Sequence, residues 1–441
     1  MSSSLASPLR ASPRAKILAS MRGRGFPRVQ ASFSEPLNVD VDVDVDVDLR
    51  SIASLGTEAE AEAEADPALA PVPSLPSPSH SCRFCRYPCK SAPAADATEP
   101  CKVAAYLEDW QDENDEKPFG FDRNYYSKHA SGFETAVVSF GGRQGSFWKS
   151  ENQDAFFVVP IHDGNEGTNP QYALGVFDGH GQNGGVASKV ASRAFAKKIE
   201  SFVKMDGGRL LSERKLNERL VEILFEHTEA AMDAYPADFE KSGTTAVVCV
   251  VSPDMVTGGW VGDSRAVVGL QTDESAATKA TRKTTNVVAI PLTKDHKPDP
   301  IRNPKEAARI AEVGGRVDRL TIDQQGRPVG PYRVFLQDRW VPGLAVSRAF
   351  GDYIAREAGV IAKPDINSLA MSGDRGSKRV VILGTDGLWE WISNEDAMRV
   401  VWSMPNAHEA ANALAEAAIK NWAMYSRGTV CDDVTVAVVF V

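Results

Sequence analysis

Residues 172–196 read YALGVFDGHGQNGGVASKVASRAFA, a strand-like run followed by a glycine-rich turn and a predicted helix. The glycines match the G-x-G-x-x-G pattern of dinucleotide-binding turns, in which the backbone approaches a pyrophosphate at a helix N-terminus. That pattern also needs an acidic residue about 20 positions later, after a second strand, but Glu200 at that distance falls inside the predicted helix. Asp178, at the end of the strand, would repel a pyrophosphate. The turn therefore needs another function.

Further aspartates stand at the ends of predicted strands. Asp154 precedes AFFVV and Asp178 follows YALGVF, so an antiparallel hairpin of these strands would place both carboxylates at one edge of a sheet. A second hairpin, turning at residues 252–254, would end its return strand near Asp263. Two more strands, RVVILG and VTVAVVFV, also have aspartates at one end. The predicted edge gathers Asp154, Asp178, Asp386 and Asp432, with Asp263 at its rim.

Carboxylates gathered in this way point to metal chemistry. Each opposes the ionisation of the others, and a multivalent cation removes that cost. Oxygen ligands without Cys or His favour Mg²⁺ or Mn²⁺ over zinc. Asp178 can bridge two ions, the carbonyl of Gly179 can bind one of them, and His180 can protonate a leaving alkoxide. One such aspartate alone is more typical of a turn or a helix cap, but five at one edge favour a metal centre.

The composition limits the classes of partner. The chain has 441 residues, 43% of them hydrophobic, and a formal net charge of -10. That charge argues against general binding to nucleic acid or to anionic membranes. No apolar run reaches the roughly 18 residues of a membrane-spanning helix. We therefore expect neither a nucleic-acid partner nor a membrane span.

The chain divides into three predicted segments. Residues 1–34 carry six Arg or Lys and no acid, as transit peptides do, although a disordered basic tail fits equally well. Residues 35–105 contain VDVDVDVD, EAEAEAEA and Pro-rich runs, and we predict that they are disordered. Residues 106–441 form the predicted globular domain. The expected location is the cytoplasm or nucleus, or a plastid or mitochondrion if residues 1–34 direct import.

Cysteine usage separates the second segment from the globular domain. Four of the six cysteines are Cys82, Cys85, Cys89 and Cys101. Their spacing, with a histidine nearby, could hold zinc, but a second well-spaced pair is missing. A solvated, reducible cluster is the favoured interpretation, and the globular domain is expected to rely on its hydrophobic core rather than on disulfides.

Nine motifs in the globular domain resemble the metal-dependent type 2C protein phosphatases, which remove phosphate from serine and threonine. In chain order they are NQDAFF, VFDGHG, SGTTAVV, GDSRAVV, LTKDHKPD, RIAEVGGRV, PGLAVSRAFGD, LGTDGLWE and CDDVTVAV. The stretch at residues 342–366 is most similar to plant and algal members. The resemblance implies an α+β fold for residues 106–441, a four-layer α/β/β/α sandwich of two mainly antiparallel sheets flanked by helices.

The resemblance also implies a metal centre of two Mn²⁺ or Mg²⁺ ions per subunit, with a weaker third ion. The implied ligands are Asp178 as the bridge, the Gly179 carbonyl on one ion, Asp386 and Asp432 on the other, and Asp263 for the third ion.

The resemblance assigns catalytic roles to three further side chains. Asp154 would orient metal-bound water, and His180 would be the general acid. Lys149 stands where the family has a phosphate-clamping Arg; lysine keeps the charge but loses the bidentate fork, so we expect looser orientation of phosphate. Gln153 replaces an acidic residue found in some members, and Asp433 occupies a position that is commonly Asn.

The leading hypothesis is a Mg²⁺/Mn²⁺-dependent serine/threonine protein phosphatase, in which water activated at a binuclear centre attacks phosphorus directly. No cysteine starts a C-x5-R loop, which excludes the tyrosine-phosphatase mechanism. The expected partners are phosphorylated proteins, and we expect a monomer. Two alternatives remain open: a catalytically weak regulatory module that binds phosphoproteins, and a hydrolase of phosphorylated small molecules.

Other motifs predict structure rather than chemistry. Capping patterns predict helix starts after Asn303, Ser393 and Asn406. LTKDHKPD predicts a Pro-rich turn rather than a metal site. Arg348 and Asp352 are predicted to pair beside the site, and residues 271–286 to form an exposed loop.

Overall fold

The computed structural model describes residues 123–128, 133–144, 147–149, 151–161, 171–206, 214–271, 287–371 and 378–441. The predictions for residues 1–34 and 35–105, including the cysteine cluster, lie outside these ranges. So do the predicted domain start at residue 106 and almost all of the predicted loop at residues 271–286.

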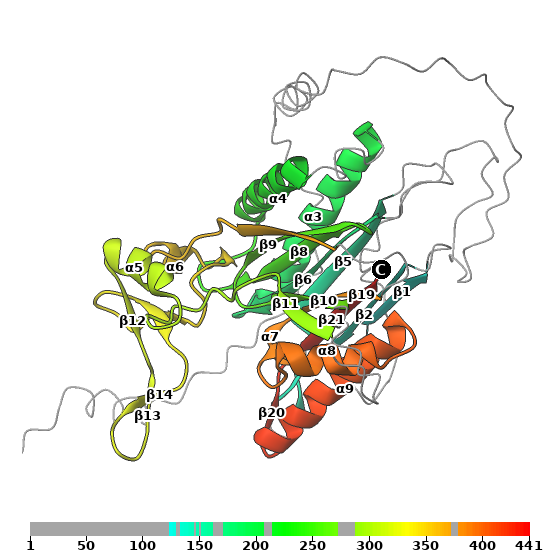
Figure 1. Ribbon diagram of the computed structural model, residues 1–441. Coiled ribbons are helices and arrows are strands. Elements are labelled where there is room, and N and C mark those ends of the chain that lie inside the picture. The colour runs from blue at the N-terminus through cyan, green and yellow to red at the C-terminus, as the bar shows by residue number, and fades with distance from the viewer. Residues whose placement is uncertain are drawn as a thin grey trace, which may run out of the picture. The chain divides into compact units, whose positions relative to one another are not determined.

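Two sheets form the centre of the fold (Figure 1). The first has six strands in the order β1-β2-β21-β19-β10-β11. In that order their bounds are Arg123–Lys128, Glu134–Phe140, Val434–Phe440, Arg379–Gly384, Arg265–Gln271 and Val287–Pro291. All pairings within this sheet are antiparallel.

The second sheet has seven strands. Six follow the order β17-β7-β6-β8-β9-β18, and β5 pairs with β6. In that order, with β5 last, their bounds are Phe350–Gly351, Gly243–Thr244, Gln171–His180, Ala246–Val251, Met255–Val261, Asp365–Ala370 and Asp154–Ile161. These pairings are antiparallel too, so the predicted sheet type is confirmed.

The central strands are continuous hydrophobic runs because both of their faces are buried. Successive side chains point to opposite faces of a strand. In β5, Phe156 packs between the two sheets, whereas Phe157 packs into the core that α3 and α4 cover. In β21, Val439 packs between the sheets and Val438 packs toward α8 and α9. Each sheet thus contributes to two cores.

Helices cover the outer faces of both sheets (Figure 1). The second sheet is covered by α3 (Gly184–Asp206) and α4 (Arg214–Ala234). The first is covered by α7 (Asp386–Trp389), α8 (Asn394–Trp402) and α9 (Ala407–Tyr425). The layers therefore run helices, sheet, sheet, helices, and the predicted four-layer α/β/β/α sandwich is confirmed. Among the helices that the structure describes, none is both long enough and apolar enough to cross a membrane.

Helix starts follow the predicted capping patterns. The side chains of Ser393 and Asn406 each accept a hydrogen bond from the backbone N–H three residues later. Helix α5 (Pro304–Glu312) also begins directly after Asn303, as predicted. The Asn303 side chain does not cap the helix, however, because it donates to carbonyls of the preceding loop, that of Lys297 among them.

Residues 292–364, which connect β11 to β18, form an insert beside the sandwich (Figure 1). The insert has a small core of its own, to which α5, β15 and α6 contribute. Besides α5, its elements are β12 (Gly315–Asp318), β13 (Thr321–Ile322), β14 (Pro328–Val329), β15 (Arg333–Leu336), β16 (Pro342–Leu344), β17 and α6 (Tyr353–Arg356). A further small sheet is formed by β20 (Val430–Cys431), β3 (Arg143–Gln144) and β4 (Phe147–Trp148).

Candidate active site

Three carboxylates of the second sheet share one edge. The β5–β6 register places Asp154 opposite Asp178, so the predicted hairpin is confirmed. Thr245 fixes this edge, because its N–H donates to the Asp178 carbonyl (2.9 Å) and its hydroxyl accepts from the Asp178 N–H (3.1 Å). Asp263 lies two residues beyond the end of β9, at the end of the second predicted hairpin.

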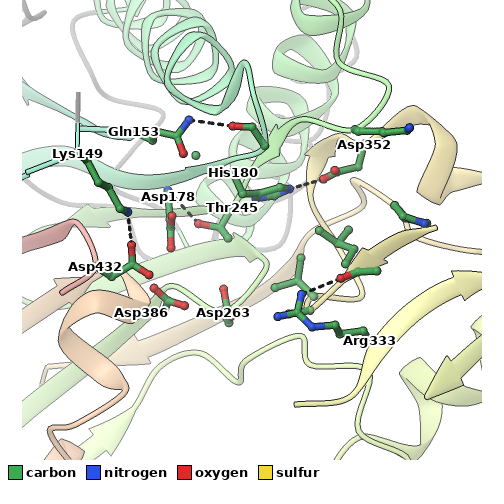
Figure 2. A pocket seen from close by; sticks show the side chains of 18 residues that line it. Lys149, Gln153, Asp178, His180, Thr245, Asp263, Arg333, Asp352, Asp386 and Asp432 are labelled. Carbon is green, nitrogen blue, oxygen red and sulfur yellow. Dashed lines mark hydrogen bonds and ion pairs between the residues drawn. The ribbon is translucent and has the colours of Figure 1, made fainter. Parts of the chain in front are cut away.

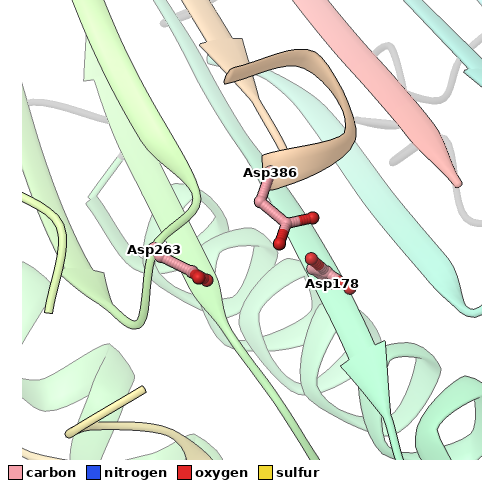
Figure 3. Close-up of side chains that lie close together, drawn as sticks. All are labelled: Asp178, Asp263 and Asp386. Atoms are coloured by element: carbon pink, nitrogen blue, oxygen red, sulfur yellow. The ribbon is translucent and has the colours of Figure 1, made fainter. Parts of the chain in front are cut away.

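The first sheet supplies the carboxylates that face them. Asp386 is the first residue of α7, just beyond β19, and Asp432 lies between β20 and β21. Carboxylate oxygens of Asp178, Asp263 and Asp386 lie within 4.8 Å of one another (Figure 3). Residues distant in the sequence, from both sheets, thus meet at one point.

Seven of the eight predicted site residues line one cavity of about 370 Å³ (Figure 2). They are Lys149, Asp178, Gly179, His180, Asp263, Asp386 and Asp432. The eighth, Asp154, is fully buried. The insert contributes to the lining through Arg333, Asp352 and residues 342–346.

Hydroxyl groups of the first sheet hold Asp154. Its Oδ2 accepts hydrogen bonds from Thr385 Oγ1 (2.9 Å) and Thr435 Oγ1 (2.6 Å). The backbone N–H of Asp154 donates to Asn152 Oδ1 at 3.0 Å. Because Thr385 follows β19 and Thr435 belongs to β21, these bonds join the two sheets at the edge of the site.

Burial and mutual repulsion disfavour the charged forms of these carboxyl groups. Burial and the neighbouring Asp263 raise the pKa of Asp386 to about 7. Burial and Asp386 raise the pKa of Asp178 well above its usual range, and burial and Asp433 do the same for Asp154. A bound cation would relieve this repulsion.

Two lysines contact the carboxylates. Lys149 Nζ lies 2.5 Å from Asp432 Oδ1 and 3.2 Å from Asp433 Oδ2 (Figure 2 shows the first contact). Lys297, from the insert, forms an ion pair with Asp263. Burial alone would lower the pKa of each lysine, but the adjacent carboxylates outweigh burial and raise it. Both side chains are therefore cationic at neutral pH.

Gly179 occupies a position where no side chain fits. A Cβ atom there would lie 2.2 Å from the Gly184 carbonyl oxygen and 2.5 Å from that of Gln153. Gly181 has a φ of +85°, which favours glycine. The glycines of the G-x-G-x-x-G match are thus explained by the close approach of β6 to the start of α3.

His180 is held by a carboxylate of the insert. Its Nε2 lies 2.6 Å from Oδ2 of Asp352, which is 1% exposed (Figure 2). Asp352 has a left-handed backbone, with a φ of 50°, and its N–H donates to the Ser242 carbonyl at 2.9 Å. Burial lowers the pKa of His180, but Asp352 more than offsets burial, so the pKa is raised.

The predicted pairing of Arg348 with Asp352 is wrong. Arg348 instead binds Glu306 Oε1 and Asp365 Oδ1, each at 2.7 Å. The left-handed residue at the start of α6 is the reason, because the chain turns there and Asp352 faces His180.

The rim position predicted for Asp263 is also wrong. Asp263 is 4% exposed and belongs to the inner group, whereas the side chain of Asp432 is 41% exposed. Gly262, with a φ of +92°, allows the chain to turn after β9. Asp432 lies in the short link between β20 and β21, where solvent reaches it.

Comparison with known proteins agrees with this geometry. A sequence model described as Protein phosphatase 2C matches residues 138–426, which is more than half of the chain. The chain belongs to the protein phosphatase 2C family. The resemblance noted in the sequence is thereby confirmed.

Plant members of the protein phosphatase 2C family are similar over much of the chain. Probable protein phosphatase 2C 48 of Oryza sativa subsp. japonica is 31% identical over 343 residues, covering 71% of this chain and 90% of its own length. Probable protein phosphatase 2C 72 of Arabidopsis thaliana is 31% identical over 278 residues, covering 62% and 78%. Serine-threonine phosphatase 2C from Toxoplasma gondii shares the fold, with a TM-score of 0.56 at 22% identity, covering 73% of this chain and 99% of that structure.

Sequence reasoning missed several residues of this phosphatase 2C site. They are Lys297, Thr385 and Thr435, and the contact of Asp352 with His180 was missed as well. The threonines carried a signal, since each lies within three residues of a predicted carboxylate. Lys297 belongs to LTKDHKPD, whose other polar residues do stay outside the site: Asp295 pairs with Arg265 at 2.7 Å, and His296 is buried.

Proposed function

We propose that this chain is a serine/threonine protein phosphatase that depends on Mg²⁺ or Mn²⁺ and transfers the phosphoryl group of phosphoserine or phosphothreonine directly to water. The charge balance of the site carries the proposal. When all six carboxyl groups are ionised, they and the two lysine ammonium groups carry four net formal negative charges, which two divalent cations would neutralise. The groups counted are Asp154, Asp178, Asp263, Asp386, Asp432 and Asp433, with Lys149 and Lys297.

The donor set fits hard divalent cations. The carboxylates that line the cavity offer oxygen atoms only, as Mg²⁺ and Mn²⁺ prefer. Asp178, which faces Asp386 and Asp263, is the residue that would bridge two ions. The other proposed ligands are the Gly179 carbonyl, Asp386 and Asp432, with Asp263 for a weaker third ion. When bound, such cations lower the pKa of water and polarise phosphoryl oxygens.

The remaining residues bind phosphate and move protons. Lys149 lines the cavity and presents an ammonium group with three donors, which suits the oxygens of a phosphate. Asp154, fixed by Thr385 and Thr435, would orient the attacking water. His180, whose pKa Asp352 raises, would donate a proton to the departing serine or threonine oxygen.

One experiment tests the proposal. The purified chain would be assayed on a phosphothreonine peptide with Mn²⁺, with EDTA, and as the Asp178→Asn variant. We expect activity only in the wild type with Mn²⁺. Activity that survives chelation or the substitution would contradict the metal centre. Complete inactivity of folded wild type at every Mn²⁺ concentration would instead favour a phosphoprotein-binding module.

A further inference from the structure

Lys297 occupies the position in which a cation would bind Asp263. Its ammonium group forms an ion pair with Asp263 Oδ2. Asp263 is 4% exposed, and its carboxylate belongs to the group of three whose oxygens lie within 4.8 Å of one another. A divalent ion that uses Asp263 must therefore displace the lysine or share the carboxylate with it.

The backbone holds Lys297 close to its partner. The N–H of His296 donates to the carbonyl of Gly262, the residue before Asp263, at 2.8 Å. On the other side, the carbonyl of Lys297 accepts from Asn303 Nδ2 at 3.1 Å. The ammonium group is thus tethered by its own side chain, and short tethers give effective concentrations in the mM range or above.

The other carboxylates of this group differ. Among the residues that the structure describes, Asp178 and Asp386 form no ion pair with a lysine or arginine. Their carboxylate oxygens lie within 4.8 Å of each other, so a divalent cation between them would relieve their repulsion. At Asp263 a cation gains less binding free energy, because Lys297 already places a positive charge beside this carboxylate.

We propose that Lys297 acts as a tethered competitor that weakens cation binding at Asp263, so that this position fills after the one between Asp178 and Asp386. The inference rests on the proposed metal-dependent function. It makes Lys297 a determinant of how many cations the site holds at a given concentration. Removing one positive charge at contact distance strengthens divalent-cation binding by about tenfold or more.

Mn²⁺ binding, measured by isothermal titration calorimetry on the full chain, tests the proposal without using activity. The variants are Lys297→Met, Lys297→Arg and Lys294→Met. Lys294 is a matched control, because it lies in the same loop and its ammonium group donates to the carbonyl of Arg302 rather than to a carboxylate of the site. We expect Lys297→Met to tighten one class of Mn²⁺ sites by about tenfold or more, whereas Lys297→Arg and Lys294→Met keep the wild-type affinity.

The double variant Asp263→Asn with Lys297→Met locates the effect. The double variant should lack the tighter class of Mn²⁺ sites seen in Lys297→Met, because the carboxylate that pairs with Lys297 in the wild type has been removed. Unchanged or weaker binding in folded Lys297→Met would overturn the inference. If Lys297→Met does not fold, Lys297→Gln takes its place and the same outcomes decide. Wild type that binds no Mn²⁺ at all would refute the metal centre itself, which separates that failure from the failure of the inference.

Discussion

Asp154 and Asp178 stand directly opposite each other in the antiparallel β5–β6 pair, and the pKa of each is raised above its usual range. Two ionised carboxylates at one register position destabilise the fold unless a positive charge lies between or beside them. The lysines of the site contact other carboxylates, namely Asp432, Asp433 and Asp263. Burial raises the pKa of Asp178, and so does repulsion from Asp386 and Asp154, so a cation beside Asp178 would relieve repulsion from both neighbours.

Mn²⁺ should stabilise the folded protein through Asp178. At a concentration 100 times its dissociation constant, a ligand adds about 2.7 kcal/mol to the free energy of unfolding, which raises Tm by roughly 5–10 °C. Without Mn²⁺, Asp178→Asn should melt a few degrees above wild type at pH 7, because a carboxyl group with a raised pKa loses its stabilising contribution as pH rises. With Mn²⁺, the variant should lose most of the gain. Differential scanning calorimetry measures the change in Tm with and without Mn²⁺, and Asp338→Asn, at an exposed position, is the control.

Asp352→Asn should impair proton donation by His180. The pKa of His180 would fall without the Asp352 charge, so the alkaline limb of the kcat profile should move to lower pH. On a phosphothreonine peptide we expect kcat to fall by about 10²-fold, the lower range for general acid catalysis. p-Nitrophenyl phosphate, whose leaving group needs no proton, should lose much less. Equal losses on both substrates would show that Asp352 supports the fold rather than His180.

Lys149 should contribute to substrate binding. Lys149→Met removes a charged donor worth about 1.5–3 kcal/mol, which corresponds to a rise in KM of about tenfold or more. Lys149→Arg should lower KM below the wild-type value, because the guanidinium fork binds phosphate through two bonds. Steady-state kinetics at saturating Mn²⁺ separate KM from kcat. Identical KM values in all three proteins would remove Lys149 from the phosphate site.

Glu306 should stabilise the insert at neutral pH. Its side chain is 9% exposed and binds Arg348 at 2.7 Å and Arg309 at 2.8 Å. Glu306→Gln should therefore cost about 3 kcal/mol, the lower end for a broken buried ion pair. Urea unfolding measures the loss, and Glu312→Gln, an exposed change at the end of the same helix, should have little effect.

The effect of Glu306→Gln on stability should depend on pH. Burial would raise the pKa of Glu306, but the bonds from Arg348 and Arg309 outweigh burial and lower it. The contribution of ionised Glu306 to the free energy of unfolding is therefore complete above the unfolded-state pKa of about 4.5. It decreases as pH falls toward the folded-state pKa. The difference in stability between wild type and Glu306→Gln should begin to shrink below about pH 4.5 and should close only as pH approaches the lowered folded-state pKa. A difference that persists at low pH would show that shape, not charge, is responsible.

Much of the site could be predicted because its residues stand at the ends of strands. Antiparallel pairing of neighbouring strands is local, so the pairing of Asp154 with Asp178 follows from two hydrophobic runs that are adjacent in the sequence. The position of Asp386 after β19 follows from the same kind of pattern. The two-sheet architecture was implied by the resemblance to the type 2C phosphatases, and the hydrophobic runs without alternation agree with strands that are buried on both faces.

The contacts of the insert could not be predicted in this way. Asp352 contacts His180 although 172 positions separate them in the sequence. The direction of its side chain depends on the left-handed backbone of Asp352 itself, a conformation that is usually marked by glycine. Lys297 meets Asp263 because the loop before α5 is hydrogen-bonded to the end of β9. Such contacts depend on how the insert packs against the sandwich, which local patterns do not encode.

The bonds from Thr385 and Thr435 to Asp154 have a mechanical consequence. They cross from one sheet to the other at the edge where the carboxylates of both sheets meet. Cations bound there by carboxylates of both sheets would cross-link the two sheets and oppose any sliding of one sheet over the other. Pulled apart in a single-molecule experiment across the two sheets, the protein should resist a higher force with Mn²⁺ than with EDTA, and the resistance should fail in one step.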